Sequence, residues 1–101
     1  MECSVFIVSL TYKSELSEVD KLISEHVTFL EKYYASGKFI ASGRKVPRTG
    51  GIILVNASNK AEVDAIIKED PFYIANVANY EITEFVPTMA SKEFESIKNC
   101  I

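Results

Sequence analysis

His26 and Asp70 are the residues of this chain whose chemistry suits acid/base work. His26 is the single histidine among 101 residues, and Asp70 stands in "IIKEDPFYIAN", between an apolar helical pattern and Pro71. A carboxylate that binds one ring nitrogen fixes the tautomer of the imidazole and leaves the other nitrogen free to exchange a proton with a substrate. The two residues lie far apart in the sequence, so their pairing depends on the fold.

Each of these two residues also has a simpler interpretation. A histidine on the apolar face of a helix is commonly a buried side chain with a satisfied hydrogen bond. An aspartate directly before a proline is common where a helix ends, and Pro71 would end a helix here. Residue types alone therefore leave a catalytic and a structural role open for His26 and for Asp70.

A basic segment supplies a second set of candidate site residues. Arg44, Lys45 and Arg48 place three positive charges within five residues of a chain whose net charge is −3. The guanidinium group of arginine matches carboxylate and phosphate geometry, which favours a site for an anionic ligand. The alternative is a solvated hairpin rim. Arg44 is the strongest candidate, because Gly43 beside it would let a ligand approach the backbone.

The composition restricts the class of protein. The length suits one domain, and the apolar content of 48% suffices for a packed core. The negative net charge argues against general nucleic-acid binding. No apolar run is long enough to span a membrane, and "MECSVFIVSLTY" at the start lacks the features of a signal peptide. We therefore expect a cytoplasmic protein without nucleic-acid or membrane partners.

The residue spacing predicts neither a metal site nor an organic cofactor. One histidine with scattered carboxylates has no recognisable metal-ligand spacing. Cys3 and Cys100 lie near opposite ends of the chain, which is neither a zinc spacing nor a redox CxxC. We expect two buried or incidental thiols, because a disulfide would require the termini to meet and is disfavoured in a reducing cytosol.

Apolar periodicity predicts the elements that must position these residues. Strands are expected over 3–12, 38–45, 51–56 and 76–86, helices over 15–36 and 59–69, and a short terminal helix over 91–101. The first strand is apolar on both faces, which favours a central position, and the last has mixed faces that suit an edge. "VPRTGG" is expected to form the hairpin turn, with Pro47 and the glycine pair supplying its geometry.

The two predicted helices have recognisable ends and apolar faces. In the first helix the apolar stripe consists of Leu16, Val19, Ile23, Val27, Leu30 and Tyr34. His26 falls on or beside this stripe, which should face the sheet. Ser17 with Asp20 resembles a capping box, Ser14 is the alternative cap, and Gly37 suits the C-terminal end. Asn59 with Glu62 resembles a second capping box.

The order strand, helix, strand, strand, helix, strand predicts an α+β fold, the ferredoxin-like βαββαβ antiparallel sheet. Both helices then pack antiparallel to each other on one face of the sheet, which allows Asp70 to approach His26. The other face needs a cover, and a second copy of the chain is the simplest one. We therefore expect a homodimer, or a higher oligomer built on it.

At this point the residues match a known family. "HVTFLEKYYASGKFIASG" from His26, "PRTGGIIL", "DPF" from Asp70 and "YEITEFVP" together resemble the YCII-related (YciI-like) family over about residues 5–88. The resemblance implies a dimeric α+β barrel domain over 1–88, followed by a C-terminal helical tail over 89–101. It also implies an active site on His26 and Asp70. Many members have proline after the strand-end glycine, where this chain has Arg44.

The resemblance favours a small cofactor-independent enzyme of lyase or isomerase type, since some relatives catalyse elimination on chlorinated rings. His26 would move a proton and Asp70 would orient it, in elimination, isomerisation or hydrolysis of a small anionic or cyclic metabolite. The predicted substrate-binding residues are Ser42, Gly43, Arg44, Arg48 and Phe72. The alternative is a non-catalytic dimeric ligand-binding or interaction module in which the His–Asp pair is structural.

Overall fold

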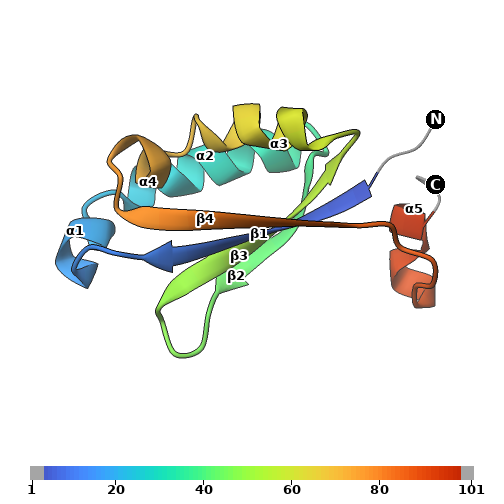
Figure 1. Cartoon of the computed structure of the whole chain (residues 1–101), viewed down its shortest axis with the longest axis horizontal. Helices are drawn as coiled ribbons and strands as arrows, with labels where there is room; N and C mark the ends of the chain where they lie inside the picture. The colour runs from blue at the N-terminus through green and yellow to red at the C-terminus, as the bar shows by residue number, and fades with distance from the viewer. Residues whose placement is uncertain (1–3, 99–101) are drawn as a thin grey trace.

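The computed structural model describes residues 4–98, which form one antiparallel sheet with its two main helices on one face (Figure 1). In chain order the elements are β1 (Ser4–Tyr12), α1 (Leu16–Asp20), α2 (Ile23–Ala35), β2 (Phe39–Arg44), β3 (Gly50–Ala57), α3 (Lys60–Ile67), α4 (Pro71–Ile74), β4 (Ala78–Phe85), the 3-10 turn η1 (Lys92–Phe94) and α5 (Glu95–Lys98). The strand order is β2-β3-β1-β4, with every neighbouring pair antiparallel. The predicted ferredoxin-like fold is confirmed.

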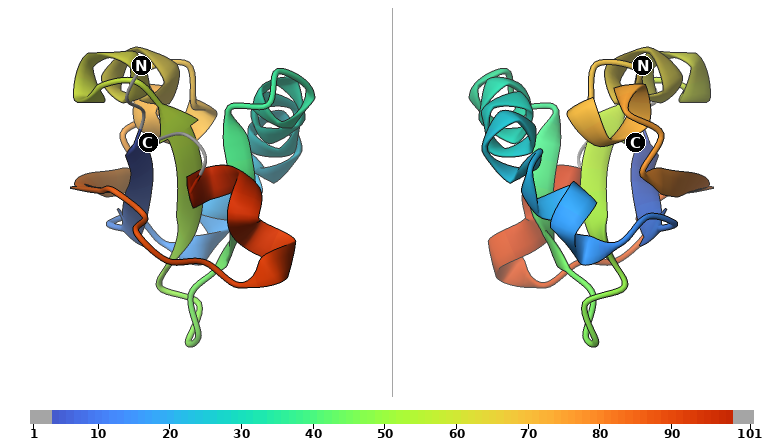
Figure 2. Two further views of the ribbon diagram at one scale, coloured as in Figure 1. Left: turned by 90° about the vertical axis from the view of Figure 1, so that its right-hand side faces the viewer. Right: turned by 90° about the vertical axis from the view of Figure 1, so that its left-hand side faces the viewer.

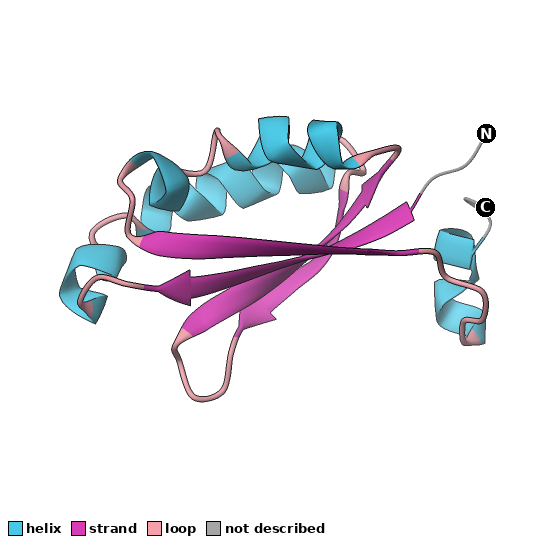
Figure 3. Ribbon diagram, viewed as in Figure 1, coloured by secondary structure: helices cyan, strands magenta, loops and turns pink. Residues whose placement is uncertain are grey.

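The core lies between the sheet and the helices, and the end-on views show α2 and α3 together on one face of the sheet (Figure 2). Phe6, Val8 and Leu10 of β1 and Val55 of β3 are at most 2% exposed. Full burial of such a side chain stabilises the fold by about 1.5–3 kcal/mol. As predicted, β1 is central and β4 is an edge strand, most of whose residues are exposed or half-buried. Figure 3 shows α2, α3 and α4 together on one side of the strands.

The helix predicted over 15–36 is in fact two helices, because the chain turns at Lys21–Leu22 between α1 and α2. The predicted capping by serine is also wrong: Glu15 is the N-cap of α1, and its side chain makes no capping hydrogen bond.

The turn shifts the apolar stripe, because a helical period counted across it loses its phase. Val27 and Tyr34, expected to face the sheet, are 43% and 39% exposed. The side chains of α2 that pack on the core are instead Ile23, Phe29, Leu30 and Tyr33. His26 lies three residues before Phe29, so it falls on the side of α2 that faces the sheet.

Pro71 does not end the preceding helix, contrary to our prediction. The helix α3 already ends at Ile67, and Pro71 is the first residue of α4. Proline is well tolerated there, because the first N–H groups of a helix have no partner within the helix and the fixed φ of proline suits that position. Asp70 is thereby the N-cap of α4, and its side chain accepts a hydrogen bond from the Phe72 N–H.

Other local predictions were confirmed in part. Asn59 caps α3 by accepting a hydrogen bond from the Glu62 N–H, and Gly37 has φ +80 after α2. The glycine pair lies in β3 and not in the turn. A Cβ on Gly50 would collide with the backbone carbonyl of Leu10 on β1, so glycine is required by this close approach of two strands.

Some predictions lie beyond what the structure describes or tests. Cys3 and Cys100 lie outside the described residues 4–98, so the interpretation of both thiols stays a prediction. The domain boundary at residue 88 also stays a prediction. In the described part of the chain, no helix is long and apolar enough to cross a membrane.

Candidate active site

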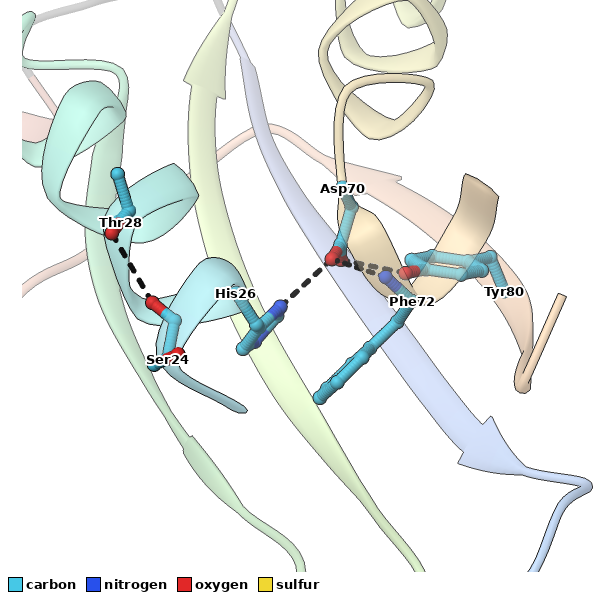
Figure 4. Close-up of polar contacts among 6 residues, drawn as sticks. All are labelled: Ser24, His26, Thr28, Asp70, Phe72 and Tyr80. Atoms are coloured by element: carbon cyan, nitrogen blue, oxygen red, sulfur yellow. Dashed lines mark hydrogen bonds and ion pairs between the residues drawn. The ribbon is translucent and has the colours of Figure 1, made fainter. Parts of the chain in front are cut away.

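Asp70 lies at the junction of α3 and α4, and its side chain points into the layer between helices and sheet (Figure 4). The residue is 0% exposed. Its Oδ1 accepts a hydrogen bond from the Phe72 N–H at 3.0 Å and lies 2.8 Å from Nδ1 of His26. The structure therefore brings together the two residues that the sequence put forward as an acid/base pair.

Tyr80, on β4, is a third member of this group that sequence reasoning missed. Its hydroxyl donates to the second carboxylate oxygen, Oδ2 of Asp70, at 2.6 Å. Tyr80 and Ile82 are two residues apart on one strand and therefore lie on the same face of the sheet. This spacing could have signalled the role, because a tyrosine that faces the core needs a hydrogen-bond partner. Burial raises the pKa of Tyr80, and the neighbouring Asp70 carboxylate raises it further. The hydroxyl therefore remains a donor.

The His26 ring lies between the buried carboxylate and a cleft. The side chain is 13% exposed and stacks on Phe72, with ring centroids 4.0 Å apart and planes at 10°. An ionised carboxylate can only accept hydrogen bonds, so with Asp70 ionised the donor of this contact is Nδ1 of His26. In a neutral ring Nε2 then carries a lone pair, and this nitrogen has no hydrogen-bond partner within residues 4–98.

The cleft has a volume of about 580 Å³ and lies between α1, α2, β1 and the β2–β3 hairpin. Its polar lining residues include Asp20, His26, Ser42, Arg44 and Arg48, and its apolar ones include Leu10, Ile23, Leu30, Ile53 and Phe72. All five residues predicted to bind substrate border it, together with His26. Asp70 does not border it, whereas the His26 ring, whose Nδ1 lies 2.8 Å from Asp70, does.

The two arginines of the hairpin differ in their partners. Arg48 donates to Oδ1 of Asp20 on α1 at 2.6 Å, so an ion pair links α1 to the hairpin at the cleft. Arg44 is exposed and has no acidic group within 4.0 Å in the described part of the chain. Lys45 points elsewhere, donating to Oγ1 of Thr11. Of the two hairpin arginines, Arg44 is therefore the one without an acidic partner within residues 4–98, and it can meet an anionic ligand.

The strand end beside Arg44 offers further polar groups and space. Oγ of Ser42 lies 2.7 Å from the hydroxyl of Tyr34, a residue of α2 expected to face the sheet. A Cβ added to Gly43 would meet no atom within 4 Å. Open space therefore lies beside the backbone at the position where the sequence suggested that a ligand approaches.

The His, Asp and Glu side chains of the described residues, which are the types that could bind a metal ion, lie dispersed over the structure. Among residues 4–98 there is no group of three or more His, Cys, Asp or Glu that could hold a metal ion. The groups that line the cleft and could do chemistry are the imidazole, two guanidinium groups, one carboxylate and hydroxyls. This set can move a proton and bind a negative charge.

Comparisons with known proteins agree with this geometry at the level of the fold. The family model for the YCII-related domain matches residues 5–86. One similar solved structure is that of 5-chloro-2-hydroxyhydroquinone dehydrochlorinase from Burkholderia phenoliruptrix, in complex with 2,5-dihydroxybenzoquinone. Its TM-score is 0.70 at 18% identity, and the match covers 80% of this chain and 92% of that chain. A comparison with curated proteins gave no match.

Proposed function

The chain belongs to the YCII-related family, and from this premise we propose that it is a small enzyme using His26 and Asp70 as an acid/base pair. One observation carries the proposal: the His26 ring connects a buried carboxylate to a cleft. Its Nδ1 lies 2.8 Å from Asp70, while the ring lines a cavity of about 580 Å³. A titratable residue held by a buried charge at the wall of a cleft is typical of a functional site.

The chemistry that follows is proton abstraction by Nε2 of His26. The ring takes a proton from a substrate C–H, and the Asp70 carboxylate stabilises the imidazolium that forms. In an elimination the C–H electron pair becomes a C=C bond, and the leaving group on the adjacent carbon departs with its own electron pair. In an isomerisation His26 returns the proton to another carbon. General acid/base catalysis of this kind contributes about 10²–10⁴-fold to the rate.

The lining of the cleft favours a small ring that carries an anionic or oxygen substituent. Ile23, Leu30 and Phe72 offer apolar surface, and Arg44 offers a cation without an acidic partner in the described chain. The similar dehydrochlorinase is named for a chlorinated hydroxyhydroquinone and was solved with a dihydroxybenzoquinone. We infer that oxygenated six-membered rings, with and without a halogen, are the first class to test.

The test is a turnover assay with a panel of chlorinated and hydroxylated hydroquinones, followed by absorbance and by release of chloride. We expect turnover by the wild type and a loss of about 100-fold or more in kcat for His26→Gln. Glu25→Gln, an exposed neighbour on α2, is the control and should retain full activity. Turnover that survives His26→Gln unchanged would contradict the proposal.

A non-catalytic ligand-binding module is the second candidate, and the complete burial of Asp70 is the observation that favours it. In that case the His26–Asp70 pair has only a structural role in the core. Binding of 2,5-dihydroxybenzoquinone without turnover would support this alternative. A loss of about 3 kcal/mol or more in unfolding free energy for His26→Ala, as expected when a buried charge loses its partner, would support it as well if the wild type turns over no ring compound.

We also propose that two copies of the chain pack through the sheet face that α2 and α3 leave uncovered (Figure 2). Ile7 and Leu54 are cross-strand partners there, and they alternate with the core residues Phe6 and Val55. Light scattering at micromolar concentration should show a dimer, and Leu54→Glu should yield a monomer. Thr28→Glu, on the exposed side of α2, should remain a dimer. A monomeric wild type would contradict this.

A further inference from the structure

We propose that Tyr80 is a positioning residue that keeps the His26–Asp70 pair in its proton-accepting form. Its hydroxyl holds the buried carboxylate so that the His26 hydrogen stays on Nδ1 and Nε2 offers a lone pair to the cleft. The catalytic consequence rests on the proposed function, whereas the effect on the tautomer does not. The hydrogen-bond donors around Asp70 are distributed unequally between its two carboxylate oxygens.

Within residues 4–98, the two oxygens of Asp70 have unequal sets of partners. Oδ1 has two, the Phe72 N–H and Nδ1 of His26. Oδ2 has one, the Tyr80 hydroxyl at 2.6 Å (Figure 4). The side chain is only 1% exposed, so bulk water does not reach it. Removing the Tyr80 hydroxyl would therefore leave Oδ2 buried without a donor, an arrangement that proteins avoid.

A carboxylate in that position can relieve the loss by accepting the Nδ1 hydrogen of His26, while Nε2, on the ring that lines the cleft, takes up a proton from water. A protonated carboxyl is a hydrogen-bond donor. It can then donate to Nδ1 of His26, which requires the ring hydrogen to lie on Nε2 instead. The ring would present an N–H to the cleft and could no longer accept a proton from a substrate. One hydroxyl outside the cleft thus decides which ring nitrogen is available.

The surroundings of Tyr80 suit such a role. Its ring lies on β4 and packs edge-on against Tyr73, with centroids 5.7 Å apart. It lines a second cavity, of about 480 Å³ between α3 and β4, and not the cleft that His26 lines. Tyr80 is therefore placed to act through Asp70 and not by touching the substrate. Burial and the Asp70 charge both raise the pKa of Tyr80, so the phenol stays protonated at neutral pH.

The single histidine makes the experiment direct, because ¹⁵N-histidine labelling reports one ring. Long-range ¹H–¹⁵N spectra of the neutral ring should show the hydrogen on Nδ1 in the wild type. In Tyr80→Phe, which keeps the ring packing, the Nε2–H tautomer should become the major form. Tyr73→Phe is the matched control, since Tyr73 is 45% exposed and its hydroxyl makes no hydrogen bond within residues 4–98. It should give the wild-type spectrum.

An unchanged tautomer in Tyr80→Phe would overturn the proposal. If that variant does not fold, two NMR measurements on the wild-type protein test the proposal. They are the tautomer of the His26 ring and the exchange rate of the Tyr80 hydroxyl proton, which is observed at the labelled Cζ of Tyr80. A ring with its hydrogen on Nε2, or a hydroxyl in fast exchange, would reject the role. Slow exchange together with Nδ1–H would support it.

The same variants separate this inference from the proposed function. A tautomer change in Tyr80→Phe, with no turnover of any ring compound by the wild type, would support the role of Tyr80 and count against the enzyme. Turnover in which Tyr80→Phe has the wild-type kcat and tautomer would count against Tyr80 alone. If both hold, Tyr80→Phe should lower kcat at least tenfold with little change in KM.

Discussion

Asp70 and the hairpin arginines are charged residues of one candidate site, but their surroundings are opposite. Asp70 is fully buried and lies within hydrogen-bond distance of three groups on three separate elements. Arg44 is exposed and has no acidic partner in the described chain, and Arg48 has an acidic partner, Asp20, whose side chain is 56% exposed. A buried charge is tolerated only with a full set of partners, whereas an exposed charge can exchange its partner for water or ligand.

This difference assigns different work to the two regions. The buried region consists of Asp70 and its partners His26, Phe72 and Tyr80. It can set the tautomer of His26, because these buried groups cannot exchange one another for water. The rim formed by Arg44 and Arg48 can adapt to what enters the cleft. Substitutions in the buried region should therefore alter folding and chemistry together, whereas substitutions at the rim should alter ligand affinity alone. Four experiments test this contrast, in order of decreasing effect.

The largest effect is expected for Asp70→Ala. The Phe72 N–H, the Tyr80 hydroxyl and His26 would all lose a buried partner, so the unfolding free energy should fall by about 3–5 kcal/mol. Urea denaturation measures this. Asp64→Ala is the control, because Asp64 pairs with Lys60 on the exposed side of α3 and should change stability by less than about 0.5 kcal/mol. Equal losses of unfolding free energy in Asp70→Ala and Asp64→Ala would contradict the contrast between buried and exposed charges.

Tyr80→Phe should come next. It leaves Oδ2 of Asp70 buried without a donor, which should lower the unfolding free energy by about 1–3 kcal/mol. Tyr73→Phe removes an exposed hydroxyl and should leave the thermal midpoint unchanged. A thermal melt of both variants gives the comparison. The buried region would be less constrained than we argue if their midpoints were the same.

Arg44→Gln should alter affinity without altering stability. Removing a charge-assisted hydrogen bond weakens binding of an anionic ligand about tenfold. Titration calorimetry with 2,5-dihydroxybenzoquinone, the ligand of the similar structure, measures this. Lys68→Gln is the control, since Lys68 is an exposed cation that lines the second cavity. A fall in stability for Arg44→Gln with unchanged affinity would contradict this prediction, because it would assign Arg44 a role in folding and not in ligand binding.

The smallest effect is expected for Asp20→Asn. It releases Arg48 from its ion pair, so the same probe should bind about twofold more tightly at low salt, because exposed pairs are weak. The gain should vanish when salt screens the charges, and also in the double variant Asp20→Asn with Arg48→Gln. Weaker binding by Asp20→Asn would show instead that the pair itself shapes the cleft.

The sequence predicted the fold more reliably than the local details of the site. The two apolar faces of β1 predicted its central position, and Asn59 with Glu62 predicted the cap of α3, because both signals depend on near neighbours in the chain. The turn at Lys21–Leu22 was missed, since no glycine or proline marks it. The helix α4 was also missed, because proline both ends helices and begins them, and only the path of the chain decides between the two.

By itself the sequence determined the order of the four strands and two main helices, the core strand and the residue types able to move a proton. These follow from periodicity and side-chain chemistry, which act over a few residues. Only the tertiary structure decided that His26 meets Asp70 and that Tyr80 holds the far oxygen of that carboxylate. It also decided that Arg48 pairs with Asp20, whereas Arg44 has no acidic partner within residues 4–98. Those contacts join residues from separate elements, and they depend on how α2, α4 and β4 pack and not on any local pattern.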